Sequence, residues 1–157
     1  MHRVVGIIVE SDTPVEARSN AIEFLDAESE NDTWIDWYQG VKKSGRWDLK
    51  QFPDEPVLLS SITANTLCKN LIKNAQNDFD LFFDKGLAGL KEQGKKNLED
   101  TCMFFRLASG SSSCWLFDNT SWGGGGNIRD NEGLTRLKKY LKKENKKAYI
   151  CLFDTHS

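Results

Sequence analysis

Residues 3–16, RVVGIIVESDTPVE, decide the fold of this chain. The first half of this stretch is short, apolar and rich in β-branched residues, which is typical of a central strand buried on both faces. Thr13, Pro14 and Glu16 then form a capping-box sequence with proline at the first helical position. We therefore predict a buried strand that is followed at once by a helix running to about Glu28.

The chain closes on a second segment of the same kind, AYICLFDTHS. Its apolar part, Ala148–Phe153, predicts another buried strand. Before it, residues 131–147 carry leucines at helical spacing with lysines between them, which predicts an amphipathic helix capped by Asp130 or Asn131. TCMFFRLA and CWLFD stand on either side of a serine-rich turn and predict a hairpin over residues 101–118.

Residues 34–100 interrupt this pattern of strands and helices. We interpret them as an insertion made of an irregular tryptophan-rich segment and two helices. Without the insertion the order is strand, helix, strand, strand, helix, strand, which is the split βαβ or ferredoxin-like pattern. The sequence therefore predicts a single α+β domain over residues 1–157, with a ferredoxin-like antiparallel sheet and a helical insertion. In that topology the first and last strands are neighbours.

The composition predicts a soluble, cytoplasmic protein. Charged residues make up 28% of the chain, and no apolar run approaches the ~20 residues that a membrane span needs. The N-terminus MHRVVGIIVESD lacks a small-residue cleavage site, so we expect no secretory signal. The four cysteines lie far apart and form no CxxC pair, so we expect buried, reduced thiols.

Charge is distributed unevenly along the chain. Residues 1–40 carry nine acidic and two basic side chains, whereas residues 131–147 carry seven basic and two acidic ones. We interpret these regions as two solvated helix faces that attract one another; the alternative is an interaction surface. The net charge of −2 argues against nucleic-acid binding, so binding of nucleic acid through the lysine-rich helix is only a third hypothesis.

The end of the last strand is the first candidate site. His2 and His156 are the only histidines of the chain, and the predicted topology places both on one sheet edge with Asp154. Alternate residues of a strand point to one face, so Asp154 and His156 can converge. Imidazole and carboxylate groups are metal ligands, which makes His2, Asp154 and His156 a candidate metal site. The alternative is that they are the solvated fringe of a finished strand.

The segment DWYQGVKKSGRW is the second candidate site. Its polar and aromatic residues Asp36, Tyr38, Arg46 and Trp47 fall in an irregular region, and loops carry binding residues more often than cores do. An arginine beside a tryptophan can stack on it and still bind a carboxylate or phosphate through two hydrogen bonds. The alternative is a structural Asp–Arg pair with tryptophans filling the space beneath the insertion.

A glycine loop, SWGGGGNIRD, precedes the last predicted helix. A glycine loop at a helix N-terminus can hold phosphate. However, no Lys-Ser/Thr pair follows as in a P-loop, and four consecutive glycines are more typical of a mobile loop.

The two candidate segments together resemble a group of small uncharacterised proteins found in phages and mobile elements. In that group a D-[WY]-Y…G-R-W motif follows a first strand and helix, and the chain ends in a strand with Asp-x-His. The matching residues here are Asp36, Trp37, Tyr38, Gly45, Arg46, Trp47, Asp154 and His156. The sequence VKKS stands where the group has a short glycine link. The group has no established activity, so the resemblance implies only that these separated residues meet in one place.

The function we expect first is that of a small accessory protein which binds a protein or a small anionic ligand. Arg46 would hold the anionic group, and Tyr38 and Trp47 would stack on it. Asp154 and His156 would orient them.

The alternative function is a metal-dependent hydrolase that acts on a phosphoester. Asp154 and His156 would be metal ligands together with Asp36 or His2, and Arg46 would stabilise the developing negative charge. Apart from this divalent metal we expect no cofactor. The sequence does not decide between an enzyme and a binding protein, and it predicts no oligomeric state.

Overall fold

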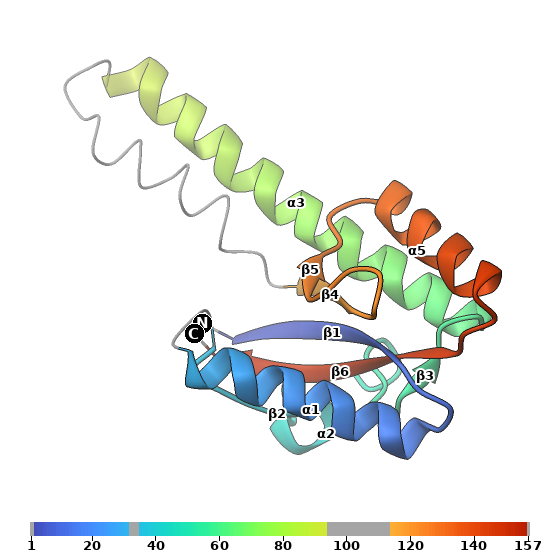
Figure 1. The fold of residues 1–157 in the computed structure, drawn as a ribbon. Coiled ribbons are helices and arrows are strands. Elements are labelled where there is room, and N and C mark those ends of the chain that lie inside the picture. Colours follow the sequence, from blue (N-terminus) through green and yellow to red (C-terminus); the bar gives the residue numbers. More distant parts are fainter. Residues whose placement is uncertain (1, 32–34, 94–113, 157) are drawn as a thin grey trace.

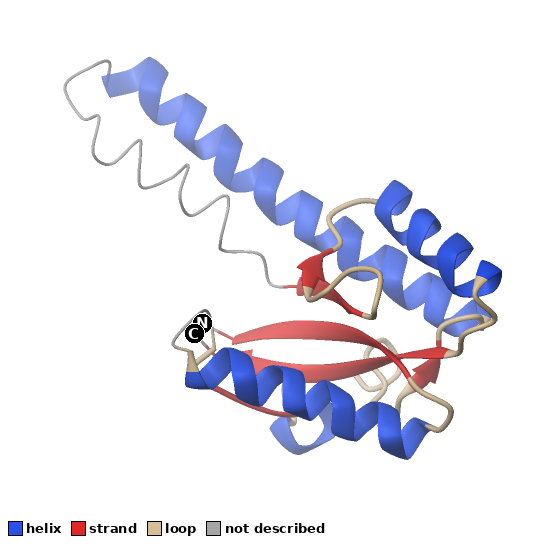
Figure 2. Cartoon of the chain, in the orientation of Figure 1, coloured by secondary structure: helices blue, strands red, loops and turns tan. Residues whose placement is uncertain are grey.

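The computed structural model describes residues 2–31, 35–93 and 114–156. It is a mixed α+β structure in which helices cover both faces of a six-stranded sheet (Figures 1 and 2). The strands are β1 (His2–Glu10), β2 (Trp37–Gly40), β3 (Val57–Leu58), β4 (Cys114–Asn119), β5 (Gly126–Asn127) and β6 (Ala148–His156). The helices are α1 (Pro14–Glu30), α2 (Val41–Ser44), α3 (Ile62–Gln93) and α5 (Asn131–Lys143). None of the helices in these ranges is both long and apolar enough to span a membrane.

The sheet is built around the pair β1 and β6. The strand order is β2-β6-β1-β4-β5, and β3 also pairs with β6. β1 and β6 are antiparallel along their whole length, which places His2 opposite His156. Figure 1 shows the start of β1 beside the end of β6. The prediction that the first and last strands are neighbours is therefore confirmed.

The ferredoxin-like antiparallel topology is not confirmed by the strand order. β4 pairs with β1 in the parallel direction, with Val4 opposite Cys114, so the sheet is mixed. A parallel pair needs a long crossover, and the chain between β1 and β4 supplies one that includes α1 and α3. Residues 114–118 of the predicted hairpin form part of β4. Its first strand falls outside the described residues, so the hairpin stays a prediction.

Within the predicted insertion over residues 34–100, the described residues 35–93 contribute strands to the main sheet. β2 and β3 both pair with β6, and α3 packs on the sheet through its buried face. The two helices predicted in this region form one continuous helix, α3. Its glycines cost only about 1 kcal/mol each in helix propensity, so they do not have to end the helix.

The start of α1 follows the capping sequence. The Thr13 hydroxyl accepts a hydrogen bond of 3.2 Å from the Glu16 amide, and Pro14 is the first helical residue. The Glu16 carboxylate reaches back beyond Thr13, where it accepts from the Ser11 hydroxyl at 2.8 Å and from the Asp12 amide at 3.4 Å. The cap therefore ties the helix to the turn that follows β1.

Two apolar layers hold the helices on the sheet. On one face α1 packs against β1 and β6, and on the other face α3 and α5 pack over the same strands and β4. Fully buried side chains at the centres of these layers are Ala17, Ala21 and Leu25 on the α1 face and Leu71 and Leu137 on the other.

Three cysteines, Cys68, Cys114 and Cys151, are buried and free of disulfides, while Cys102 lies outside the described residues. Burial raises the pKa of Cys68 and of Cys151 to about 12. Neither thiol is therefore a thiolate nucleophile near neutral pH.

Gly6 leaves little room for a side chain between β1 and α3. A Cβ at Gly6 would lie 2.8 Å from Leu71 Cδ1, 3.0 Å from Leu116 Cδ1 and 3.1 Å from Ile150 Cδ1. We expect Gly6→Ala to lower the free energy of unfolding by about 1–3 kcal/mol, the range found for overpacked cores. Chemical denaturation of the two proteins measures this loss.

The contact with Leu71 can be tested by a double-mutant cycle. Gly6→Ala should cost less in a Leu71→Ala background, because the shorter side chain removes the atom nearest to the new methyl group. If the losses of unfolding free energy caused by Gly6→Ala and Leu71→Ala simply add in the double variant, the clash with Leu71 is not the cause of the destabilisation.

Candidate functional site

The residues at the end of β6 meet residues of β1 and of the segment before β2. The rings of His2 and His156 meet edge to face across the strands, with 5.2 Å between their centroids. Nδ1 of His2 lies 3.2 Å from Oδ1 of Asp154. Nδ1 of His156 lies 3.1 Å from Oδ2 of Asp36. These four predicted site residues, together with Trp37, form what we call the strand-end cluster.

Trp37 belongs to this cluster although it is absent from the predicted site. Its indole stacks on the His156 ring, with centroids 5.8 Å apart and planes 4° apart. Its edge also meets the His2 ring at 5.4 Å. Trp37 is the register partner of His156 in the β2–β6 pair. The sequence alone does not mark this position, because β2 spans only four residues and its place beside β6 comes from the strand pairing.

The other three residues predicted for this site lie elsewhere. The Tyr38 hydroxyl donates to Asp26 on α1 at 2.6 Å, and burial followed by this hydrogen bond raises the pKa of Tyr38 to about 12. Trp47 packs on the core beneath α3, edge to face with Phe52. Arg46 is exposed, and within the described residues no contact joins it to the strand-end cluster. The structure therefore does not assemble the predicted Arg–Trp–Tyr ligand site.

The strand-end cluster contains a buried carboxylate. Asp154 is fully buried, and its Oδ2 has no hydrogen-bond partner among the described residues. No three His, Cys, Asp or Glu side chains in the described part of the chain are placed to hold a metal ion together. The geometry thus gives no support to a three-ligand site of His2, Asp154 and His156, which the hydrolase alternative needs.

A cavity of about 620 Å³ lies at the other end of the sheet, where β6 begins. It is bounded by the connection from β3 to α3, by the start of α3 and by the end of α5, which meet there (Figure 1). Its apolar lining residues are Leu58, Leu59, Ile62, Leu141 and Ala148. Its basic lining residues are Lys138, Lys142, Lys146 and Lys147, and no carboxylate lines it. We call it the lysine cavity.

Helix α3 adds to the positive potential of the lysine cavity. The Ser61 hydroxyl accepts from the Ala64 amide at 3.1 Å and caps the helix, whose N-terminus carries partial positive charge. Lys138 donates to the side-chain oxygen of Asn65 at 2.9 Å. Burial is the main cause that lowers the pKa of Lys138. An anion beside this partly desolvated ammonium would therefore be favoured.

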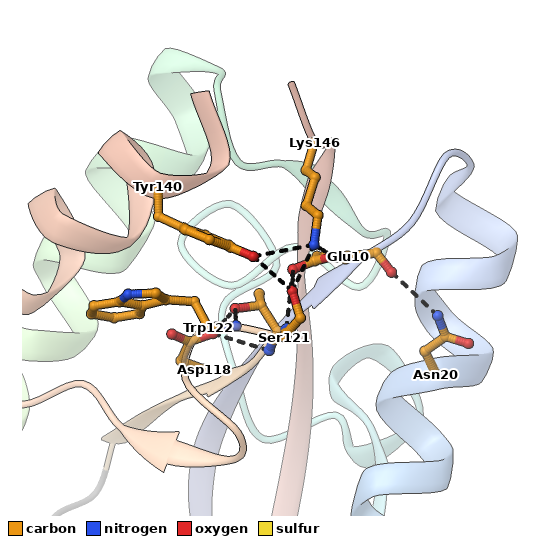
Figure 3. Close-up of polar contacts among 8 residues, drawn as sticks. Glu10, Asn20, Asp118, Ser121, Trp122, Tyr140 and Lys146 are labelled. Atoms are coloured by element: carbon orange, nitrogen blue, oxygen red, sulfur yellow. Dashed lines mark hydrogen bonds and ion pairs between the residues drawn. The ribbon is translucent and has the colours of Figure 1, made fainter. Parts of the chain in front are cut away.

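Lys146 connects the cavity to a polar network on the loop after β4 (Figure 3). Its Nζ lies 2.9 Å from Oε2 of Glu10, 2.7 Å from the Ser121 hydroxyl and 3.2 Å from the Tyr140 hydroxyl. Glu10 also accepts from the hydroxyl and amide of Ser121, at 2.6 and 3.0 Å. Trp122 stacks on Tyr140 beside this network. The end of β1, the loop after β4 and α5 are thereby held together.

The serine–lysine contact in this network does not make Ser121 a nucleophile. The hydrogen bond to Glu10, and then that to Tyr140, raises the pKa of Lys146. Burial opposes the shift at Glu10, but hydrogen bonds from Ser121 and Lys146 lower its pKa. A lysine that activates a serine must be a neutral amine. The network is therefore an ion pair with structural contacts.

The glycine loop packs over an acidic group on β4. A Cβ at Gly123 would collide with the carboxyl group of Asp118. Asp118 accepts from the hydroxyl and amide of Thr120, at 2.6 and 3.0 Å, while burial raises its pKa. Asp130 caps α5 by accepting from the Gly133 amide at 2.7 Å. Asp118 on β4 and Asp130 at the start of α5 therefore both border this loop, together with Arg129 and Arg136.

No protein-family model matches the chain, and neither does any curated protein or solved structure. The resemblance to small phage and mobile-element proteins stays a prediction.

The Glu10–Lys146 pair predicts a pH-dependent stability. The pKa of Glu10 is lowered in the folded protein, so its charge stabilises the fold above the ordinary pKa of 4.5, and this contribution is lost as the pH falls through the folded value. We expect Glu10→Gln to be less stable than the wild type at neutral pH. The gap in unfolding free energy, measured by urea denaturation, should narrow as the pH falls below 4.5.

Glu132→Gln is the matched control for this prediction. Glu132 pairs with Arg136 on the exposed surface of α5, where such pairs contribute little. The unfolding free energy of this variant should be close to that of the wild type at neutral pH and also below pH 4.5. A Glu10→Gln gap that stays constant in acid would show that the charge of Glu10 is not the source of its effect.

Proposed function

We propose that the protein binds a small organic anion with an apolar body in the lysine cavity. The observation that carries this proposal is the lining itself, with four lysines and no carboxylate around an apolar floor in a space of about 620 Å³. Small-molecule sites in proteins are typically apolar cavities of about 300–1,000 Å³ with a few polar groups that orient the ligand. The proposal retains the small anionic ligand expected from the sequence and moves its site away from Asp36–Trp47.

The charge of the cavity supports an anionic ligand. Lys146 is paired with Glu10, whereas Lys142 and Lys147 form no ion pair within the described residues. The surroundings of the cavity therefore stay positive even when Glu10 is counted. Hydrogen bonds to charged groups contribute about 1.5–3 kcal/mol each, so two free ammonium groups can add substantially to the affinity.

The apolar lining supports a ligand with a hydrocarbon or ring body. Ile62, at the start of α3, is 88% exposed although it lines the cavity beside Leu58. A ligand that covers such a side chain gains hydrophobic stabilisation in addition to its charge contacts. The cationic lining residues are all lysines, which act as point charges and do not form the paired hydrogen bonds of arginine. The site therefore suits a phosphate, sulfonate or carboxylate head group.

The experiment uses amphipathic anions of defined structure. Binding of anilinonaphthalene sulfonate is followed by its fluorescence, and decyl phosphate, decanoate and decanol then compete with it. We expect the two anions to displace the probe more strongly than decanol. We expect Lys142→Glu combined with Lys147→Glu to weaken decyl phosphate binding at least tenfold, which corresponds to about 1.4 kcal/mol.

Lys139→Glu combined with Lys143→Glu is the matched control. Both lysines are exposed on α5 and neither lines the cavity. This double variant changes the net charge by the same amount as Lys142→Glu combined with Lys147→Glu. This control should bind decyl phosphate within about twofold of the wild type. Equal losses of affinity for decyl phosphate in the two double variants would indicate general electrostatic attraction and contradict a defined site. Failure of the wild type to bind any of the anions would also contradict the proposal.

The same variants separate small-anion binding from the nucleic-acid hypothesis. A single-stranded oligonucleotide would contact the whole basic face of α5, so both double variants would weaken it, and its affinity would fall steeply with salt. If the oligonucleotide bound in this way and decyl phosphate did not, the nucleic-acid hypothesis would replace the proposal.

A further inference from the structure

We infer that His2 and His156 form a binding site for a borderline transition-metal ion such as Zn²⁺ or Cu²⁺. This inference does not depend on the anion proposal, because the strand-end cluster lies at the opposite end of β6 from the lysine cavity. The two histidines come from opposite ends of the sequence and are register partners across β1 and β6. Residues paired in this way on adjacent antiparallel strands have their Cβ atoms about 4.5–5.5 Å apart.

The first observation for a metal site is the contact that each Nδ1 makes. Nδ1 of His2 lies 3.2 Å from Asp154, and Nδ1 of His156 lies 3.1 Å from Asp36. A carboxylate at this distance assigns the proton to Nδ1 and leaves the lone pair on Nε2. Carboxylate–histidine pairs of this kind are the usual support of a metal-bound imidazole. Neither Nε2 has a hydrogen-bond partner within the described residues.

The second observation is the placement of the two rings, whose centroids are 5.2 Å apart and whose planes are inclined by 70° in an edge-to-face arrangement. A zinc–nitrogen bond is about 2.0–2.1 Å long, and the centre of the ring lies about 1.2 Å further on. Two imidazoles on one tetrahedral ion therefore have centroids about 5 Å apart. The rings are thus at a spacing that one ion can bridge.

The surroundings of the two rings favour a cation and hold the rings in place. The carboxylates of Asp36 and Asp154 supply negative charge next to the imidazoles, and Oδ2 of the buried Asp154 has no partner among the described residues. Trp37 stacks on His156 and meets the edge of His2, which limits the rotation of both rings. The histidine side chains are 27% and 37% exposed, so an ion can reach them.

This assignment changes the role expected for Asp154. In the structure its Oδ1 faces Nδ1 of His2, so Asp154 positions a ligand and is not itself one. Asp36 positions the ring of His156 in the same way, through its contact with Nδ1. The described residues supply two nitrogen ligands, and the remaining positions on the ion are filled by water or by a group from a binding partner. Nitrogen ligands select Zn²⁺ and Cu²⁺ over Mg²⁺ and Ca²⁺, which prefer oxygen.

The test uses full-length, tag-free protein stripped with EDTA. Thermal unfolding is followed with ZnCl₂, CuCl₂ or MgCl₂, and imidazole nitrogen signals are followed by NMR. We expect Zn²⁺ and Cu²⁺ to raise the Tm by roughly 5–10 °C at a hundredfold excess over Kd, with no effect of Mg²⁺. In the NMR spectrum Zn²⁺ should shift the Nε2 signals of both histidines and leave Nδ1 protonated.

Three variants separate the ligands from the positioning groups. His2→Ala and His156→Ala should each abolish the Zn²⁺-dependent rise in Tm. Asp36→Asn should retain binding but weaken it about 10–100-fold, as loss of a supporting carboxylate does. Cys102→Ser should bind Zn²⁺ like the wild type, because the site uses no thiol.

The inference is overturned by either of two results. One is that Zn²⁺ shifts neither the Tm nor the Nε2 signals of the wild type. The other is that Zn²⁺ still binds to His2→Ala and His156→Ala with unchanged affinity, which would place the ion elsewhere. Because the NMR signals are read in the folded wild type, instability of a variant cannot hide the outcome.

Discussion

The antiparallel pairing of β1 with β6 is the interaction on which the rest of the structure depends. It runs from the pair His2–His156 to the pair Glu10–Ala148, so the two strands align over their full length. β2 and β3 attach to the free edge of β6, and β4 attaches to the free edge of β1. The helices then cover the two faces of this central pair. Each candidate site lies at one of its ends.

The two ends of the β1–β6 pair differ in charge. One end gathers the carboxylates of Asp36 and Asp154 around two imidazoles, and the other gathers lysines around an apolar cavity. The segregation follows from the chain path, because Lys146 and Lys147 immediately precede β6 and His156 ends it. The two ends of the same sheet therefore differ in the charge that they present.

Local sequence patterns predicted those parts of the fold that have a strong local cause. The first strand, the capped α1, the amphipathic α5 and the last strand all follow from patterning and capping, and the pairing of first and last strands follows from their order. The parallel direction of β4 could not be predicted, since it depends on α3 packing on the sheet. β2 and β3 are too short to show periodicity. In the strand-end cluster, His2, Asp154, His156 and Asp36 were predictable from the sequence. The lysine cavity was not, because its lining comes from the β3–α3 connection, α3, α5 and the start of β6. No single sequence motif therefore marks the cavity.

The central pair also determines how the molecule would respond to a pulling force. His2 and His156 are adjacent at one end of two antiparallel strands. A force that draws these residues apart acts on one backbone pairing at a time, starting at His2–His156 and moving inward. Such unzipping needs less force than shearing, in which all the hydrogen bonds between two strands resist together. We therefore expect the β1–β6 pair to resist a load applied at this end less than a load that shears the two strands. An ion bridging the two histidines would fasten the first pair to be opened.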